Sequence, residues 1–132
     1  MEIIYRTDII PTAEEIIELY DDADLPRPTT DRKRIEEMYD NSNLVITAWN
    51  GEILAGVSRS ITDFCWCCYL ADLAVRKGHQ KEGIGKRLVE LTKEKAGERS
   101  MVLLLSVPTA MEYYPKLGMQ QLDNAFIIHR EK

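Results

Sequence analysis

Residues 68–88 read CYLADLAVRKGHQKEGIGKRL, and this stretch decides the fold. Its first eight residues are almost all apolar, as in a buried strand. Gly83 and Gly85 follow in a basic loop, and apolar residues then recur at helical spacing from Ile84 to Ala96. The stretch therefore predicts a strand, a mobile, positively charged glycine loop and a helix.

A second apolar run, MVLLLSV at residues 101–107, follows the predicted helix and is typical of a strand buried on both faces. Strand, helix and strand form a βαβ unit, so the two strands should be parallel neighbours with a right-handed crossover. Upstream, three apolar segments lie within residues 44–75, and Asn50-Gly51 is a strong hairpin signal between the first two. This region predicts an antiparallel meander.

The two ends of the chain complete the expected fold. A short strand at residues 2–6 precedes two helices, one with a capping box at Thr12 and Glu15 and one capped by Asp31. After the meander and the βαβ unit, Thr109 and Glu112 predict a second capping box for a short helix that Gly118 ends. Residues 124–130, NAFIIHR, predict a last strand. The expected class is α/β (α+β mixed), a mostly antiparallel central sheet with helices on both faces.

The composition predicts one domain over residues 1–132, since 45% of the residues are hydrophobic and 30% are charged. No run approaches the roughly 20 apolar residues that span a bilayer, and no secretion signal is visible, so we expect a cytoplasmic protein without a membrane partner. The net charge of −5 argues against nucleic-acid binding. Residues 76–99 nevertheless carry eight Lys/Arg against four Asp/Glu, so this segment indicates an anion site.

The cysteines Cys65, Cys67 and Cys68 lie within four residues of one another and have no distant partner. We therefore expect no disulfide framework. Zinc would need about four ligands at workable spacing, which one cluster on a strand does not offer, so no metal is expected. The three thiols are interpreted as small, buried or half-buried strand residues.

Three anion-binding motifs compete for the glycine loop. In the Walker A frame that starts at Gly78, Ile84-Gly85 stands where Lys-Ser/Thr is required, and the frame that ends in Gly85-Lys86 lacks its first glycine. A dinucleotide fingerprint lacks its third glycine. What remains is Gln-x-x-Gly-x-Gly at a strand-to-helix junction, where free N–H groups and the helix dipole attract an anion. A plain glycine turn with solvated lysines is the alternative for the loop alone.

This loop, together with AMEYYPKLGM at residues 110–119, resembles the GNAT superfamily of acyl-CoA-dependent N-acetyltransferases. The second segment is similar to the family's Ala-x-x-Phe-Tyr-x-Lys-x-Gly-Phe, and the start of the chain and the meander extend the resemblance over most of its length. The resemblance implies transfer of an acetyl group from acetyl-CoA to a primary amine of a small molecule, peptide or protein, directly in a ternary complex. Homodimers are common among similar proteins. A non-catalytic acyl-CoA-binding regulatory module is the alternative.

The resemblance also implies a binding site for acetyl-CoA. Main-chain N–H groups of the loop and helix start would hold the pyrophosphate; these residues are Gln80, Lys81, Glu82, Gly83, Ile84, Gly85 and Lys86. The strand edge formed by Leu73, Ala74 and Val75 would pair with the pantetheine arm, where the two parallel strands splay apart. The family's helix often has an asparagine three residues before the alanine, a position that Val107 occupies here, so Ser106 or Thr109 would have to replace that contact.

Two residues are expected to take part in catalysis. Tyr114 aligns with the family's motif tyrosine and would protonate the departing thiolate. Its neighbour Tyr113 should point about 100° away, so the two cannot both face the sulfur. Asp72 is a lone carboxylate in an apolar strand, where the pKa tends to rise, and would receive or orient the amine. An outward-facing or salt-bridged Asp72 stays open as the alternative, and water could also carry the proton. Arg27 and the first two helices are expected to wall the acceptor side.

Overall fold

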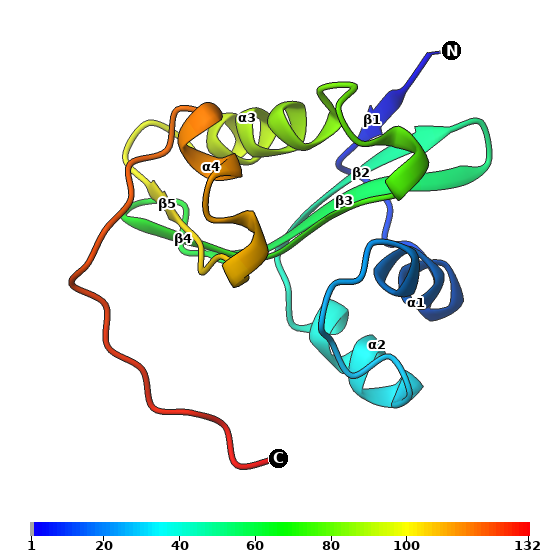
Figure 1. The fold of residues 1–132 in the computed structure, drawn as a ribbon, viewed down its shortest axis with the longest axis horizontal. Coiled ribbons are helices and arrows are strands. Elements are labelled where there is room, and N and C mark those ends of the chain that lie inside the picture. The colour runs from blue at the N-terminus through cyan, green and yellow to red at the C-terminus, as the bar shows by residue number, and fades with distance from the viewer. Residues whose placement is uncertain (1) are drawn as a thin grey trace.

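The computed structural model describes residues 2–132, which form a five-stranded sheet in the order β1-β2-β3-β4-β5 (Figure 1). The first four strands are antiparallel to their neighbours, and the fifth lies parallel to the fourth. Their bounds are β1 Ile4–Arg6, β2 Leu44–Asn50, β3 Ile53–Thr62, β4 Cys67–Val75 and β5 Met101–Leu103. The mostly antiparallel sheet and its single parallel pair confirm the predicted class.

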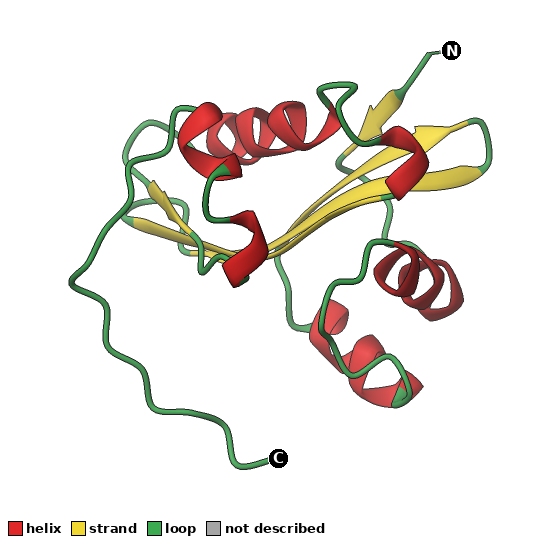
Figure 2. Ribbon diagram, viewed as in Figure 1, coloured by secondary structure: helices red, strands yellow, loops and turns green. Residues whose placement is uncertain are grey.

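Helices cover both faces of this sheet (Figure 2). The helices α1 (Ala13–Asp22) and α2 (Arg32–Asp40) lie on one face, and α3 (Ile84–Ala96) lies on the other. Two short 3-10 helices, η1 (Lys77–His79) and η2 (Pro108–Ala110), precede α3 and the four-residue α4 (Tyr113–Lys116). None of the helices among residues 2–132 is long and apolar enough to cross a membrane.

Local signals placed the first elements correctly. Thr12 and Glu15 form the predicted capping box, with distances of 3.2 Å from the Glu15 N–H to the Thr12 hydroxyl and 2.9 Å from the Thr12 N–H to the Glu15 carboxylate. The Asp31 carboxylate accepts from the Arg34 N–H and caps α2. Gly51 adopts a φ of +60° in the turn between β2 and β3, as the hairpin signal requires.

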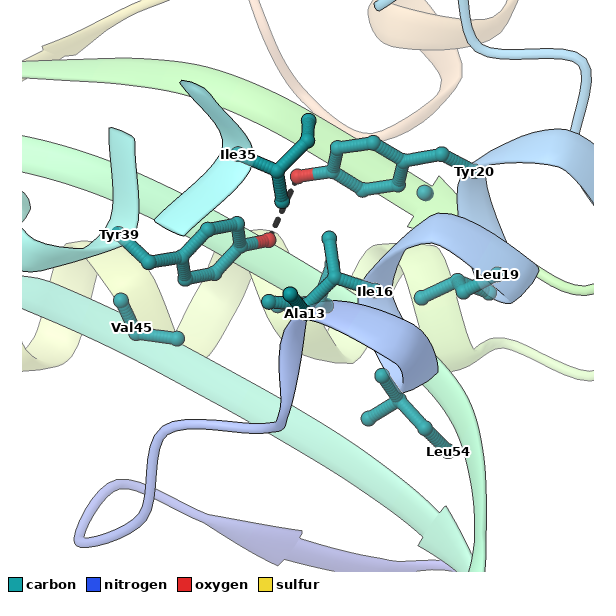
Figure 3. Packing of buried hydrophobic residues seen from close by; sticks show 10 residues of the cluster. Ala13, Ile16, Leu19, Tyr20, Ile35, Tyr39, Val45 and Leu54 are labelled. Atoms are coloured by element: carbon teal, nitrogen blue, oxygen red, sulfur yellow. Dashed lines mark hydrogen bonds between the residues drawn. The ribbon is translucent and has the colours of Figure 1, made fainter. Parts of the chain in front are cut away.

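Two apolar cores lie on opposite sides of the sheet. On the α1 and α2 side, Ile16, Leu19 and Ile35 pack over β3, and the Tyr20 and Tyr39 hydroxyl oxygens are 2.6 Å apart (Figure 3). On the α3 side, a second cluster includes Ile46, Ala55, Cys68, Ile84 and Leu88. Each core holds one layer of helices against the sheet.

A β-bulge in β4 decides which side Asp72 faces. Arg59 of β3 pairs with Asp72, whereas the next residue, Ser60, pairs with Leu70, so Ala71 is an extra residue in β4. Because side chains alternate along a strand, the extra residue shifts the positions after it to the opposite face. The Asp72 side chain therefore joins the α1 and α2 side, although Cys68 of the same strand packs on the α3 side.

Several predictions for the second half of the chain are wrong. Residues 124–130 form no strand, and Phe126 and Ile128 are 100% and 98% exposed, because within residues 2–132 no strand lies beside this segment to satisfy its backbone groups. The run at 101–107 is not buried on both faces: β5 has three residues, and Met101 is exposed.

The short helix near the C-terminus also differs from its prediction. The segment divides into η2 and α4, and no side chain caps either, so the capping box at Thr109 does not form. Gly118, with a φ of +86°, does follow the helix end as predicted. Thr109 lies within η2 and Glu112 directly precedes α4, so the two residues do not flank the first turn of one helix.

The cysteine prediction holds for Cys68, which is buried, and fails for Cys65 and Cys67, which are exposed. The Asp63 carboxylate accepts hydrogen bonds from three successive N–H groups, those of residues 65, 66 and 67, and so holds this part of the chain in a turn. Because of this turn, β4 begins only at Cys67, and Cys65 lies outside the strand.

Candidate active site

The two parallel strands of the sheet separate soon after they meet. Register pairs join β4 and β5 only from Cys67↔Met101 to Tyr69↔Leu103. From Leu70 to Val75 the edge of β4 on this side has no neighbouring strand in the described part of the chain. This separation confirms the predicted splay, and it leaves the backbone of Leu73 and Ala74 at the edge without a strand partner.

A cavity of about 690 Å³ opens at the separated strands. Its walls combine parts of the chain that are distant in sequence: Leu73–Val75 of β4, residues 83–86, Leu104, Leu105 and both tyrosines of α4. The predicted strand edge and glycine loop therefore border one space. Of the seven predicted loop residues, Glu82 does not line it.

The glycine loop presents unused backbone donors at the start of α3. Gly83 precedes the helix with a φ of +85°, and Lys81 has a φ of +71°. Among residues 2–132, no hydrogen bond uses the main-chain N–H groups of residues 81–86, and no side chain caps α3. The Gln80 side chain donates to the Val75 carbonyl at 3.0 Å and ties the loop to the end of β4. Together with the positive end of the helix dipole, these N–H groups have the chemistry to bind an anion.

Gly85 has a packing role that the sequence did not reveal. A Cβ atom built at this position would collide with the hydroxyl group of Tyr113. Because Gly85 has no side chain, α4 can approach the first turn of α3 closely. The predicted role of Gly85, close approach of a phosphate, is therefore accompanied by contact with a tyrosine 28 positions later.

Both tyrosines of α4 line the cavity. Their ring centroids are 5.3 Å apart at an interplanar angle of 69°, an edge-to-face arrangement. Burial raises the pKa of Tyr114, the nearby Tyr113 raises it further, and the positive charge of Arg27 partly opposes the rise. The Tyr114 hydroxyl is therefore protonated at neutral pH and able to donate a proton.

Asp72 lies in a buried network of charged and phenolic groups. Its side chain is fully buried, and it accepts from Arg27 Nε at 2.6 Å, Arg59 Nε at 2.7 Å and the Tyr20 hydroxyl at 2.7 Å. Burial raises the pKa of this carboxyl, but the hydrogen bond and charge of Arg59 and the charge of Arg27 outweigh burial and lower it. The expected rise in the pKa of Asp72 is therefore wrong, because the strand is apolar but its surroundings are not.

Arg27 connects this network to the cavity. It follows α1, its Nη2 donates to the Ala71 carbonyl at 2.9 Å, and its side chain lines the cavity, whereas Asp72 does not. The three residues that bind the Asp72 carboxylate are 13 to 52 positions from it in sequence, so no local sequence pattern could have identified them.

The sequence of the chain matches the model of the acetyltransferase (GNAT) family over residues 13–119. The chain belongs to the GNAT acetyltransferase family. No curated protein matches it by sequence.

Solved structures show the same GNAT fold. A protein from meticillin-resistant Staphylococcus aureus, described as a probable acetyltransferase, has a TM-score of 0.85 and 22% identity, with 99% of this chain and 100% of that chain covered. A GNAT family acetyltransferase from Streptococcus pneumoniae has a TM-score of 0.74 and 19% identity, covering 98% and 100%. The enzyme AAC(6')-Iy, in complex with a bisubstrate analogue named CoA-S-monomethyl-acetylneamine, has a TM-score of 0.73 and 13% identity, covering 100% of both chains.

The chain departs from the GNAT motif at three positions: Val107 replaces the usual asparagine, and Tyr113 and Met119 replace the two phenylalanines of Ala-x-x-Phe-Tyr-x-Lys-x-Gly-Phe. Val107 and Thr109 both line the cavity. The Ser106 hydroxyl instead donates to the Val107 carbonyl at 2.7 Å. Of the two suggested replacements, Thr109 is the one that borders the cavity.

Proposed function

We propose that this acetyltransferase moves an acetyl group from acetyl-CoA to a primary amine, directly in a ternary complex. The observation that carries the proposal is the meeting of three features in one cavity: a loop with free N–H groups, the open edge of β4 and the protonated hydroxyl of Tyr114. A structurally similar protein binds a coenzyme A bisubstrate analogue, which supports the same use of the fold here.

The residues of the cavity fit acetyl-CoA as the acyl donor. The N–H groups of residues 81–86 would bind the pyrophosphate, with Lys81 and Lys86 adding positive charge at the cavity wall. The edge of Leu73, Ala74 and Val75 would pair with the amide groups of the pantetheine arm, as an added strand pairs with a sheet edge. The thioester would then lie where β4 and β5 separate.

Tyr114 serves as the general acid in this proposal. The neutral amine attacks the carbonyl carbon, the new C–N bond forms, and the C–S bond breaks as the thiolate leaves. The Tyr114 hydroxyl gives its proton to the thiolate, and water takes the proton that the amine loses. Holding both reactants in one cavity contributes roughly 7–11 kcal/mol to lowering the barrier.

Asp72 acts in this proposal through Arg27 and does not take the proton itself. A carboxylate that two guanidinium groups and a phenol already bind, and whose pKa is lowered, is a weak base. Its ion pair fixes Arg27 at the cavity wall, where the guanidinium lies beside the space for the acceptor. Asp72 is thus a positioning residue that orients the acceptor side.

Two measurements on the same protein test this function. Acetyl-CoA should raise the melting temperature in a thermal-shift titration, since a ligand that binds only the folded state stabilises it. Release of free thiol should then depend on the presence of an amine from a panel of small amines, peptides and proteins. Binding without thiol release on any amine would favour a non-catalytic acyl-CoA-binding module, and the absence of any thermal shift would reject the cavity as the acyl-CoA site.

A further inference from the structure

A second cavity, of about 500 Å³, lies on the side of the sheet that α1 and α2 cover. Four arginines from distant parts of the chain line it: Arg27 after α1, Arg34 of α2, Arg59 of β3 and Arg130. We refer to this cavity as the arginine pocket. Among residues 2–132, no acidic side chain lines it. Like charges around one small space repel one another unless negative charge lies among them, so the charges that compensate these arginines have to be identified.

The chain itself compensates only part of this positive charge. The buried carboxylate of Asp72 pairs with both Arg27 and Arg59, so one negative charge serves two guanidinium groups. No ion pair within residues 2–132 includes Arg34 or Arg130. The arginine pocket therefore keeps an excess of positive charge.

Arg59 also has hydrogen-bond donors that its own chain does not use. Its side chain is only 10% exposed. Its Nε donates to Asp72 at 2.7 Å and its Nη1 to the Ser42 hydroxyl at 3.0 Å, but no acceptor within residues 2–132 binds its Nη2. A buried donor without an acceptor costs free energy, and a guanidinium group has five N–H donors. Because Arg59 lines the arginine pocket, an acceptor bound there can satisfy these donors.

Arg27 lies between the arginine pocket and the cavity of the candidate active site, since it lines both. Its guanidinium group is held by three hydrogen bonds: to Asp72 at 2.6 Å, to the Pro26 carbonyl at 2.7 Å and to the Ala71 carbonyl at 2.9 Å. Pro26 and Pro28 also restrict the backbone on either side of it. A side chain that is already fixed loses little conformational entropy when it binds a ligand.

We propose that the acceptor amine carries an anionic group, a carboxylate or a phosphate, and that Arg27, Arg34 and Arg59 bind this group in the arginine pocket. The inference rests on the acetyl transfer proposed above and names the class of acceptor. The amine end lies in the active-site cavity, and the anionic end reaches past Arg27. Guanidinium groups suit this role because they bind carboxylates and phosphates through paired, charge-assisted hydrogen bonds.

Other amine classes fit the arginine pocket less well. A polyamine or a lysine-rich peptide would bring further positive charges beside arginines that already repel one another. A simple alkylamine would leave the Nη2 donors of Arg59 without an acceptor. An amine with an anionic group compensates the excess charge and satisfies these donors together.

Matched acceptors test this inference through rates of thiol release from acetyl-CoA. The carboxylate arm contains β-alanine, γ-aminobutyrate and ε-aminocaproate, each beside the alkylamine with the same number of carbons. The phosphate arm compares phosphoethanolamine with ethanolamine, and spermidine represents cationic acceptors. The best anionic acceptor should exceed its neutral match in kcat/KM by about tenfold or more, the factor expected from one hydrogen bond to a charged group. The arm that contains it identifies the anion.

Arg34→Gln removes a charge from the arginine pocket without breaking the Asp72 ion pairs. It should lower kcat/KM for the anionic acceptor by about tenfold, mainly through KM, and leave the matched alkylamine unchanged. Arg34→Lys should recover part of the loss. Lys33→Gln, which removes the same charge from the exposed neighbouring position outside the pocket, is the matched control and should behave as the wild type.

A thermal-shift titration supplies a measurement that does not depend on turnover. The product N-acetyl-γ-aminobutyrate should raise the melting temperature of the wild type and of Lys33→Gln, but not that of Arg34→Gln, and N-acetylbutylamine should shift none of them.

Three results would overturn the anionic acceptor and leave acetyl transfer intact: equal rates on anionic and neutral acceptors, a higher rate on spermidine, or an equal loss on both acceptor types in Arg34→Gln. Thiol release on no amine would instead reject the proposed function. In that case a product shift that Arg34→Gln abolishes would still support anion binding in the arginine pocket, and no shift would reject both proposals.

Discussion

Tyr113 and Tyr114 are adjacent residues of one cavity wall, but their hydroxyl groups have different neighbours. The Tyr113 hydroxyl lies against Gly85, at the loop that would hold phosphates. Tyr114 instead experiences the positive charge of Arg27, which also borders the cavity. In the proposed reaction, the tyrosine that is not held against the glycine loop would be the better placed to protonate the thiolate, and this distinguishes two tyrosines that are adjacent in sequence.

Tyr114→Phe should lower turnover by about 10²-fold or more while the affinity for acetyl-CoA stays near that of the wild type, because a general acid acts on the transition state and not on binding. Tyr113→Phe, the matched control, should keep most of the activity. The measurements are initial rates of thiol release and an acetyl-CoA titration. Wild-type turnover in Tyr114→Phe would reject the assignment, and loss in Tyr113→Phe alone would move the role to the other ring.

Asp72→Asn should lower the free energy of unfolding at neutral pH by about 3 kcal/mol, because it removes the carboxylate that pairs with the buried Arg59 and the partly exposed Arg27. The folded pKa of Asp72 lies below its ordinary value of 3.8, so its contribution is present above that value and is lost as the pH falls through the folded pKa. The difference in the free energy of unfolding between the variant and the wild type should therefore become smaller at acidic pH.

Urea unfolding at neutral pH and at about pH 3 measures this gap. Asp40→Asn, which changes an exposed carboxylate at the end of α2, is the control and should leave the stability unchanged. If Asp72 also positions Arg27, the KM for the acceptor should rise more than the KM for acetyl-CoA. An equal gap at both pH values would contradict the ion-pair explanation.

At the scale of elements, α1, α2, the hairpin and the βαβ unit could be predicted because each is encoded by caps, turns and periodicity within a few neighbouring residues. The glycine loop could be predicted for the same reason. The fate of residues 124–130 could not, since a strand needs a neighbour that the local sequence does not contain. The side that Asp72 faces depends on the bulge at Ala71, which alternation alone does not reveal.

The three glycines of the loop should respond differently to alanine, although all three lie within eight residues. Gly83→Ala should weaken acetyl-CoA binding because a side chain at a φ of +85° is strained by about 1–2 kcal/mol. Gly85→Ala should weaken it because the new Cβ meets the Tyr113 hydroxyl. Gly78→Ala should be neutral, since its Cβ would meet no atom within 4 Å.

A double-mutant cycle tests the contact behind the Gly85 prediction. In a Tyr113→Phe background the hydroxyl is gone, so Gly85→Ala should cost less in melting temperature and in acetyl-CoA affinity than it does alone. Residues in contact typically show coupling energies of about 0.5–3 kcal/mol. Additive effects of the two substitutions would mean that Tyr113 does not limit the space at Gly85.

On the scale of the whole molecule, the charge is distributed unevenly: one segment is basic although the chain as a whole is acidic. The chain carries a net charge of −5, yet residues 76–99 carry eight Lys/Arg against four Asp/Glu. Four basic side chains, those of Arg27, Lys77, Lys81 and Lys86, line the cavity, and the single acidic side chain there, that of Asp24, is paired with Lys77. The acidic remainder of the surface would repel an anionic ligand elsewhere and favour its approach at this cavity.

The affinity for acetyl-CoA should therefore fall as the salt concentration rises, because ions screen the attraction between the cavity and the phosphates over a Debye length of roughly 8 Å at 0.15 M and 3 Å at 1 M. Lys86→Ala should weaken binding only a few-fold at low salt, since the backbone N–H groups of the loop remain, and its deficit should disappear at high salt. Lys95→Ala, at the far end of α3, is the matched control and should behave as the wild type. Isothermal titrations at several salt concentrations measure these slopes. Equal slopes in Lys86→Ala and the wild type would show that the backbone and apolar walls of the cavity, and not its basic side chains, set the affinity.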